Sequence, residues 1–293
     1  MFLRRLPKFD FHAPASLPEA LDLMAQHGSG ARFIAGGTDL LLAMKKREIA
    51  PGHLVSLAGI PFLKGIGPEG RAIRIGALTT LAEIERSPLV KEQLLPLRDA
   101  VEVMASAQIR NLATIGGNLC SAVPSADTAP PLIALGASLT LLGPSGERDV
   151  PVADFFTGPK ATLARSDEIL TSITIPKPEP LSSGCYLKLM RRHAMDLALV
   201  GVAVCLKLDG DRVCRSARIA LGAVAPTPIR VPEIEALLIN KRLDEALVAE
   251  AARIAGMQCR PITDIRASLE YRCSMVEVLA KRAVMEAFRR IAG

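Results

Sequence analysis

Two short glycine-containing segments have residue types that could bind an anionic ligand. The first consists of Phe33, Ile34, Ala35, Gly36, Gly37, Thr38, Asp39 and Leu40. Adjacent glycines allow positive φ and a close approach of the backbone to a ligand, and consecutive amides in such a turn form an anion-binding nest. A helix that begins near Leu40 would add the attraction of its dipole. The alternative is an ordinary glycine turn in which Thr38 caps that helix.

The second segment lies about 80 residues downstream and consists of Thr114, Ile115, Gly116, Gly117 and Asn118, with Asp127 nine residues later. Two such loops, each expected after a strand, indicate a bound nucleotide with its diphosphate between them. Asp127 could accept hydrogen bonds from ribose hydroxyls, or it could instead be the N-cap of a helix that begins at Pro130 and Pro131. These residues do not identify the nucleotide.

A third candidate is Lys188, which lies in an expected strand and is followed by Arg191 and Arg192. A cation near an electron-accepting ring stabilises the reduced, anionic form of that ring. The alternative is a strand lysine that is solvated or paired with an acid. A GxGxxG match at residues 65–70 precedes a strand pattern and contains Pro68, so we interpret it as a turn and not as a dinucleotide fingerprint.

The sequence predicts neither catalytic residues nor metal ligands in this chain. No Ser/His/Asp arrangement is apparent, and the four histidines, at positions 12, 27, 53 and 193, are scattered along the sequence. The six cysteines lack CxxC spacing, which disfavours zinc and iron–sulfur ligation. Cys205 and Cys214 would face each other if Asp209 and Gly210 formed a two-residue hairpin turn, but we expect reduced thiols.

The composition argues against several classes of protein. The 293 residues carry a net charge of +6, and aromatic residues make up only 3% with no Trp, which disfavours nucleic-acid binding. An anionic cofactor or an acidic partner protein explains the excess of positive charge better. No apolar run is long enough for a membrane span, and the N-terminal residues lack the apolar core of a signal peptide. We therefore expect a cytoplasmic protein.

The pattern of elements predicts an α+β fold with mixed sheets. A proline-rich segment at 176–184 indicates a linker between a first domain over residues 1–177 and a second over 178–293. Expected helices and strands in the first domain include helices at 40–46, 81–86, 92–105 and 130–135 and strands at 32–35, 53–57, 72–77, 139–142 and 148–150. The second domain is expected to have three strands, at 184–190, 199–208 and 212–222, followed by helices.

Four segments carry a resemblance that covers essentially the whole chain. They are AGGTDLL, IGALTT, TIGGNLCSAVPSADTAPPLIALGA and DEILTSITIP. They resemble the FAD-binding medium subunit of molybdenum hydroxylases, the family of xanthine dehydrogenase, aerobic carbon monoxide dehydrogenase and 4-hydroxybenzoyl-CoA reductase. The resemblance implies a two-lobed FAD-binding domain of the vanillyl-alcohol-oxidase/PCMH type, with lobes over about 1–58 and 59–177. A C-terminal α/β lobe with a three-stranded antiparallel sheet and helices would follow.

The resemblance also implies roles for individual residues. Residues 33–40 would surround the FAD pyrophosphate and residues 114–118 would form the second FAD loop, while Asp127 would contact the adenosine side. Leu170 and Lys188 match positions near the isoalloxazine. Gly76 and Thr79 are expected neighbours of the cofactor, and Met104 matches a position where relatives carry an aromatic residue.

The implied activity is electron transfer within a complex. The resemblance places a molybdenum cofactor on a large partner subunit and two [2Fe-2S] clusters on a small one, in a dimer of heterotrimers. The cysteine-bearing insert of the 4-hydroxybenzoyl-CoA reductase relative is missing after Cys120, so no cluster is expected in this chain. A stand-alone flavin oxidoreductase and an assembly protein without FAD are the alternatives. The substrate and the final electron acceptor are not predicted.

Overall fold

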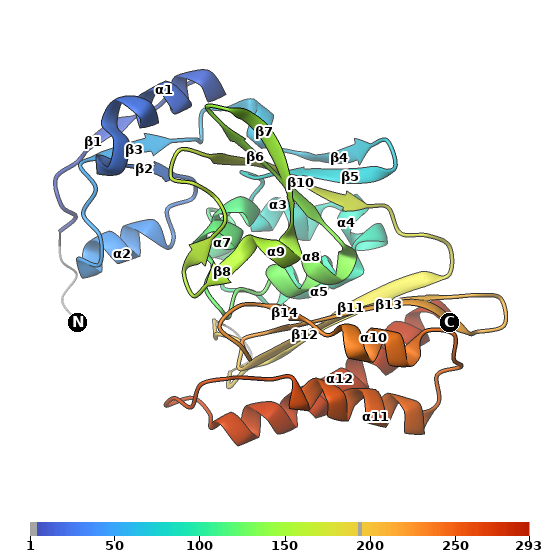
Figure 1. Ribbon diagram of the computed structural model, residues 1–293. Helices are drawn as coiled ribbons and strands as arrows, with labels where there is room; N and C mark the ends of the chain where they lie inside the picture. The colour runs from blue at the N-terminus through green and yellow to red at the C-terminus, as the bar shows by residue number, and fades with distance from the viewer. Residues whose placement is uncertain (1–4, 193–194, 293) are drawn as a thin grey trace.

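A small parallel sheet forms the N-terminal lobe in the computed structural model, which describes residues 5–192 and 195–292 (Figure 1). Its strands lie in the order β1 (Asp10–His12), β3 (His53–Ser56) and β2 (Ala31–Ile34). Helix α1 (Leu17–His27) covers one face, followed by a 3-10 turn at Gly28–Gly30, and α2 (Leu40–Lys46) covers the other. Adjacent residues Leu54 and Val55 of β3 therefore pack against different helices, as alternation along a strand requires.

A five-stranded sheet forms the second lobe, with neighbouring strands antiparallel and in the order β4-β5-β10-β6-β7. Its strands are β4 (Ile66–Glu69), β5 (Ala72–Gly76), β10 (Ile169–Pro176), β6 (Ser138–Gly143) and β7 (Gly146–Pro151). Alternate apolar residues such as Ile73, Leu139 and Ile173 point into one core. The GxGxxG match is mostly strand β4, with its turn at Gly70, so it forms no dinucleotide-binding loop.

Short helices cover the buried face of this sheet. They are α3 (Leu81–Arg86), α4 (Pro88–Gln93), α5 (Leu95–Glu102), α6 (Ala107–Arg110), α7 (Ile115–Ser121), α8 (Ala129–Leu135) and α9 (Val152–Phe155), accompanied by a 3-10 turn at Pro61–Leu63 and the short pair β8 (Phe156–Gly158) and β9 (Ala161–Thr162). The prediction of a single helix at 92–105 is wrong. The chain breaks at Leu94, because Pro96 lies in the first turn of α5 and lacks an amide to continue an earlier helix.

The C-terminal domain packs an antiparallel sheet against helices. The sheet order is β11 (Ser182–Leu189), β12 (Val200–Leu208), β13 (Cys214–Gly222) and β14 (Ile229–Arg230), and the helices are α10 (Pro232–Leu238), α11 (Glu245–Met257) and α12 (Leu269–Ala292). The prediction of three strands is therefore corrected to four. The two-residue β14 pairs only at Ala220 and Leu221 of β13, so its pattern is too short to be recognised from sequence.

The two-residue turn at Asp209 and Gly210 that would bring Cys205 opposite Cys214 does not form. Cys205 lies opposite Arg218, and Cys214 lies opposite Leu208. The Asp209 carboxylate accepts hydrogen bonds from the amides of Asp211 and Val213, which widens the turn, and the ladder shifts register before Leu208. Both cysteines are free thiols.

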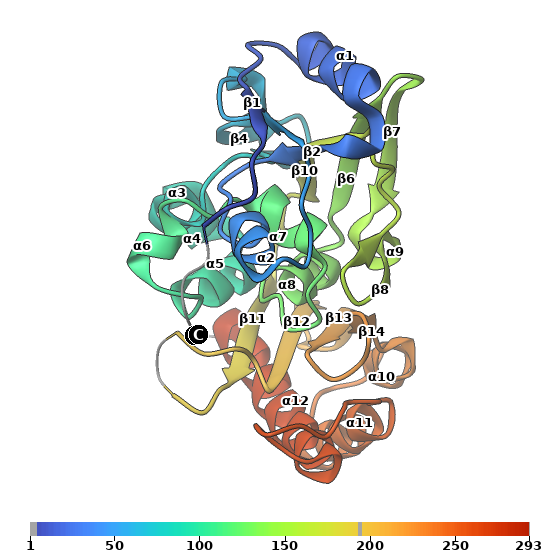
Figure 2. The same cartoon turned by 90° about the vertical axis from the view of Figure 1, so that its left-hand side faces the viewer.

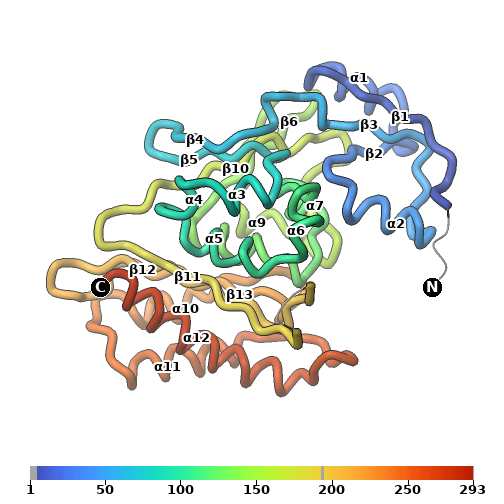
Figure 3. Tube along the Cα trace, turned by 180° about the vertical axis from the view of Figure 1, so that it is seen from behind, coloured from blue at the N-terminus to red at the C-terminus, as the bar shows by residue number. Residues whose placement is uncertain are grey.

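The C-terminal sheet lies between two layers of helices, with α5 and α8 on one side and α11 and α12 on the other (Figure 1). Figure 3 shows the same arrangement from behind. An ion pair fixes the end of α12 to the first domain, because Arg290 Nη1 lies 2.7 Å from Asp99 Oδ2 and also donates to the Gly184 carbonyl. Glu286 orients the same guanidinium from one turn earlier, at 2.7 Å. Within the described residues, no helix has the length and apolar character to cross a bilayer.

The Glu286 contacts predict an acid-dependent loss of stability. Arg289 and Arg290 lower the pKa of Glu286 to about 2. A carboxyl group with a depressed pKa in the folded state stabilises the fold above its unfolded pKa, and this contribution disappears as the pH falls toward the folded value. We expect the melting temperature to fall between about pH 5 and pH 2, and to fall less steeply in Glu286→Gln. Calorimetric scans across this range measure both slopes, and equal slopes would contradict the assignment.

Candidate functional site

The first glycine segment connects β2 to α2 and is packed too closely for any side chain at its first glycine. A Cβ at Gly36 would lie 1.8 Å from the carbonyl oxygen of Leu112. Gly37 has φ of +72°, a conformation that glycine adopts without strain. The sequence therefore places glycine here for two different reasons, close backbone contact at position 36 and a left-handed backbone at position 37.

The amides of this segment are free. No backbone or side-chain acceptor is recorded, within the described residues, for the N–H groups of Gly36, Gly37, Thr38, Asp39 and Leu40. Thr38 does not cap α2, because the N-cap position belongs to Asp39, whose side chain makes no capping bond. Five consecutive unpaired amides at a left-handed turn form the kind of concave donor surface that binds an anion.

The second glycine segment has a different structure from the one expected. Gly116 and Gly117 lie in the first turn of α7, and a short helix instead of a strand precedes them. The Gly116 amide donates to the Ala77 carbonyl, and the Gly117 amide donates to the Thr114 hydroxyl. A Cβ at Gly116 would lie 2.7 Å from the Ala77 oxygen. Both amides are already used within the protein, so the prediction that they are offered to a diphosphate is wrong.

The two segments nevertheless lie side by side, as the sequence predicts. Gly36 packs against Leu112, just before the second segment, and a Cβ at Gly117 would lie 3.9 Å from the Ala35 side chain. The Ser121 hydroxyl, at the end of α7, donates to Asp39 Oδ2 at 3.0 Å. Figure 2 shows α2 and α7 adjoining between the two lobes. The second segment thus supports the first and closes one side of it.

Asp127 and Lys188 form a buried ion pair. Lys188 Nζ lies 2.8 Å from Asp127 Oδ2, and the side chains are 1% and 7% exposed. The Tyr186 hydroxyl donates to the other carboxylate oxygen at 2.8 Å. Burial raises the pKa of Asp127, while Lys188 and Tyr186 act against that rise. Burial beside Asp127 raises the pKa of Tyr186. Sequence reasoning missed Tyr186, because an aromatic residue in a strand most often fills a core.

This pair changes the interpretation of both residues. Asp127 is not the N-cap of α8, since Thr128 occupies that position and its hydroxyl donates to Asn118 Oδ1 at 2.6 Å. Resemblance assigns Asp127 to the adenosine side and Lys188 to the isoalloxazine side, but the two side chains touch. In this structure they cannot contact opposite ends of one dinucleotide. The acid-paired alternative for Lys188 is the one observed.

The remaining candidates, Gly76, Thr79, Met104 and Leu170, are buried within the first domain. A Cβ at Gly76 would lie 2.4 Å from the Leu63 oxygen, and the Thr79 hydroxyl donates to the Gly65 carbonyl, so both positions hold the β5 end in place. Met104 follows α5, and the carbonyl of its neighbour Val103 lies 3.5 Å from Lys188 Nζ. Leu170 is buried in the core of the second lobe. Met104 and Leu170 therefore both belong to the buried core of the second lobe, which also includes Tyr186.

A cavity lies elsewhere on the molecule, beside the linker. It has a volume of about 270 Å³ and is lined by residues that include Pro96, Lys177, Ser183 and Arg218. None of the candidate cofactor-binding residues contributes to it. The candidate site is therefore defined by the glycine segments and their free amides and not by this cavity.

Comparison with known proteins defines the class of this chain. Residues 7–178 match the family described as the FAD binding domain in molybdopterin dehydrogenase, and residues 185–287 match the CO dehydrogenase flavoprotein C-terminal domain. The first match covers more than half of the chain, and the two together cover nearly all of it. The chain belongs to the family of FAD-binding subunits of molybdopterin dehydrogenases, and the predicted resemblance is confirmed.

Individual relatives cover the full length. The chain is 37% identical to the carbon monoxide dehydrogenase medium chain of Hydrogenophaga pseudoflava, over 98% of this chain and 99% of the relative. It is 33% identical to the putative xanthine dehydrogenase FAD-binding subunit of Escherichia coli, over 97% and 99%. A structure of carbon monoxide dehydrogenase from Hydrogenophaga pseudoflava matches with a TM-score of 0.95 at 37% identity, covering 98% and 99% of the two chains. Quinoline 2-oxidoreductase from Pseudomonas putida matches with 0.91 at 31% identity, over 98% and 99%.

Proposed function

We propose that this chain is the FAD-binding electron-transfer subunit of a multi-subunit molybdenum hydroxylase. It would pass electrons between [2Fe-2S] clusters of a small partner subunit and an external acceptor or donor, with the molybdenum cofactor on a large partner subunit. The relatives are medium chains and FAD-binding subunits of carbon monoxide and xanthine dehydrogenases, which supports this assembly. A dimer of heterotrimers and a cytoplasmic location belong to the same proposal.

The observation that carries the proposal is the row of free amides at residues 36–40. Their donors lack acceptors within the described chain, and unpaired amides in a turn favour a ligand with negative charge and several acceptor oxygens. The pyrophosphate of FAD has both properties. Glycine at position 36 keeps the turn in contact with Leu112, which holds the donors in one orientation. The residues present therefore fit the cofactor that the family binds.

FAD supplies the redox chemistry when it is bound, and the protein supplies binding, orientation and electrostatic tuning. We assign the pyrophosphate contact to residues 33–40. We assign a positioning role to Thr114, Ile115, Gly116, Gly117 and Asn118. They form the start of α7, and Ser121 at the end of that helix donates to Asp39 of the first segment. Contacts of Gly76, Thr79, Met104 and Leu170 with the cofactor remain predictions. A contact of Asp127 or Lys188 with it would require their ion pair to open.

The finer division of the fold is part of this proposal. We place the domain boundary between residues 177 and 178, and the break between the two family matches supports it. We place the two lobes of the first domain over 1–58 and 59–177, in the vanillyl-alcohol-oxidase/PCMH arrangement. The presence of separate three-stranded and five-stranded sheets supports this division. The first glycine segment connects β2 to α2 on the side of the N-terminal lobe that faces α7 (Figure 2). A cofactor bound there would contact both lobes.

The alternatives make different predictions for the purified chain. A subunit of the proposed kind has a flavin absorption spectrum and co-purifies with iron–sulfur and molybdenum subunits. A stand-alone oxidoreductase turns over substrate without those partners. An assembly protein without flavin shows no heat on titration with FAD after removal of any bound cofactor. Calorimetric titration followed by co-purification separates all three, and absence of FAD binding would overturn the proposal.

Gly37→Val tests the loop without removing its packing. A Cβ at this position would meet only the flexible ends of Leu41 and Ile34, at 3.1 and 3.2 Å, but φ is +72°. A β-branched residue in this conformation costs about 1–3 kcal/mol, so the chain should fold while the amides are reoriented. We expect loss of FAD retention, measured as flavin absorbance per chain. Gly30→Val, at a position with open space around it, is the control and should retain FAD. Full occupancy in Gly37→Val would refute the loop assignment.

A further inference from the structure

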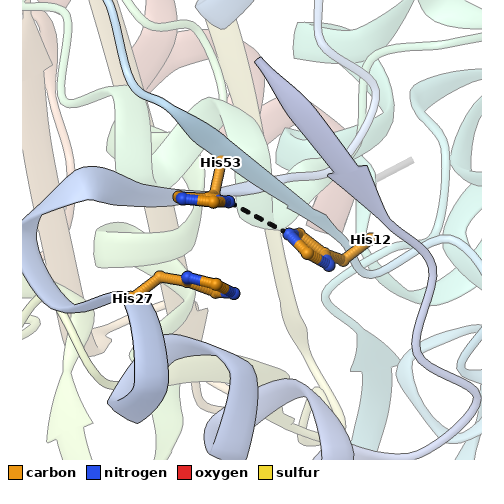
Figure 4. Close-up of side chains that lie close together, drawn as sticks. All are labelled: His12, His27 and His53. Carbon is orange, nitrogen blue, oxygen red and sulfur yellow. Dashed lines mark hydrogen bonds between the residues drawn. The ribbon is translucent and has the colours of Figure 1, made fainter.

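Three histidines that are far apart in the sequence meet in the N-terminal lobe (Figure 4). His12 ends β1, His27 ends α1 and His53 begins β3. One ring nitrogen from each lies within 4.8 Å of the other two. The four histidines are scattered along the sequence, but the fold brings three of them together, and His193 lies outside the described residues.

The strand register explains the convergence. Asp10 pairs with His53 across the parallel strands β1 and β3. Asp10 and His12 are two residues apart on one strand, so their side chains point to the same face. Helix α1 covers that face and ends at His27, immediately before the turn at Gly28–Gly30. Three separate elements therefore bring imidazole groups to one point at the end of the lobe.

The three imidazole rings lie close to one another and have few other partners among the described residues. His12 Nε2 and His53 Nδ1 are 3.2 Å apart. The rings of His27 and His53 are stacked, with centroids 3.8 Å apart and planes 17° from parallel. Asp10 Oδ2 lies 3.7 Å from His53 Nδ1. Among the described residues, no further side-chain or backbone hydrogen bond is recorded for any of the three rings.

Neutral imidazole is the form that ligates a metal ion. The hydrogen bond between His12 Nε2 and His53 Nδ1 requires a proton on one of the two nitrogens, and this proton would be released when both nitrogens ligate an ion. Among the described residues no hydrogen-bond partner is recorded for the His27 ring, so a lone pair of that ring is available to the ion.

The spacing suits a tetrahedral ion. Nitrogens bound to tetrahedral Zn²⁺ at 2.0–2.1 Å lie about 3.3 Å from each other, close to the 3.2 Å between His12 and His53. The stacked His27 ring, at the end of α1, would have to rotate about its side-chain bonds to complete the site. Asp10 or a water molecule could occupy the fourth position.

We propose that His12, His27 and His53 bind a divalent transition-metal ion of the zinc class, with Asp10 as the neighbouring carboxylate. Imidazole nitrogens select such ions over Mg²⁺ and Ca²⁺, which prefer oxygen ligands. The ion would connect β1, a three-residue strand that pairs only with β3, to α1 and β3. Its role is a structural clip on the lobe that carries the first glycine segment, and it requires no electron transfer.

Titration of the full chain with Zn²⁺ tests this proposal. After treatment with a chelator, the chain should bind one equivalent of Zn²⁺, and its melting temperature should rise with Zn²⁺ but not with Mg²⁺. His12→Asn, His27→Asn and His53→Asn should each weaken binding by at least about tenfold. His193→Asn, which removes the remaining histidine of the sequence, is the matched control and should bind as the wild type does.

Two further readouts keep the result independent of variant folding and of the six cysteines. Co²⁺ in place of Zn²⁺ should give a visible spectrum without thiolate charge-transfer bands, since the ligands are imidazoles. Crystals soaked in Zn²⁺ should show anomalous density between the three rings. Binding should weaken at pH 5.5 relative to pH 7.5, because protons compete for the three imidazoles beside Asp10. Zn²⁺ binding that persists with all three histidines replaced, or anomalous density located at cysteines alone, would overturn the proposal.

Discussion

Replacing Gly36 with alanine is expected to abolish FAD retention and to lower the free energy of unfolding by about 3 kcal/mol or more. The added Cβ would lie 1.8 Å from the Leu112 carbonyl oxygen and 2.6 Å from its carbon. Both are backbone atoms, so no rotation of a side chain relieves the overlap. The first glycine segment must instead move away from the second, and the row of free amides would lose its support.

The backbone around Leu112 has little freedom to yield. The Leu112 and Ala113 amides both donate to the Ile109 carbonyl, and the Ala113 carbonyl accepts from Leu81 at the start of α3. Thermal unfolding and flavin content of purified Gly36→Ala measure the two effects together. Gly30→Ala lies in the same lobe with nothing within 4 Å of its added Cβ and serves as the control. A Gly36→Ala chain with wild-type flavin content and melting temperature would disprove the close contact.

Lys188→Met is expected to lower the free energy of unfolding by about 3–5 kcal/mol. Asp127 and Lys188 are both buried, so removal of the ammonium leaves a carboxylate without its counter-charge. Asp127→Asn combined with Lys188→Met removes both charges and should recover part of the loss, which a double-mutant cycle measures. Denaturant unfolding of the three variants gives the coupling. Purely additive effects would contradict the pairing.

The loss of unfolding free energy in Lys188→Met is expected to depend on pH. Burial raises the pKa of Asp127, and loss of Lys188 raises it further. The folded state then binds the proton more tightly than the unfolded state does, so stability is retained below the unfolded pKa and falls as the pH rises through the folded value. The difference in unfolding free energy between Lys188→Met and the wild type should therefore become smaller as the pH is lowered toward the ordinary pKa of a carboxyl group.

A second lysine on the same sheet provides the control. Lys207 of β12 pairs with Glu179, which is 65% exposed, and an exposed pair contributes less than about 1 kcal/mol. Lys207→Met should therefore have a small effect on unfolding. The flavin potential of the Lys188→Met complex separates two roles for this residue. A shift to lower potential indicates that Lys188 faces the isoalloxazine, and an unchanged potential indicates that it serves only Asp127.

Local signals in the sequence were sufficient for much of the fold. Ser16 is a typical N-cap residue and Gly28 a typical C-cap residue, and the structure has the Ser16 hydroxyl accepting from the Glu19 amide at the start of α1 and Gly28 at its end. The alternating apolar residues of β5 and β6 predict strands, and the proline-rich segment predicts the break before β11. No strand was expected at the position of β10. These signals depend on a few neighbouring residues, so they are readable without knowledge of distant contacts.

The elements that sequence reasoning missed depend on contacts with distant residues. The two-residue β14 exists because it pairs with β13, and the helix expected at 92–105 divides where Pro96 begins a new one. The second glycine segment was expected as a turn because adjacent glycines favour one. It forms the start of α7 because Thr114 caps that helix and Ala77 accepts the Gly116 amide.

The sequence by itself determined the family and the presence of two glycine segments. Tertiary structure alone decided which amides remain free for a ligand, that Asp127 meets Lys188 and Tyr186, and that three histidines converge at the end of the N-terminal lobe. The physical reason is the range of each interaction. Turn, cap and strand preferences act over a few residues, whereas hydrogen-bond satisfaction and side-chain clustering depend on which segments the folded chain brings together.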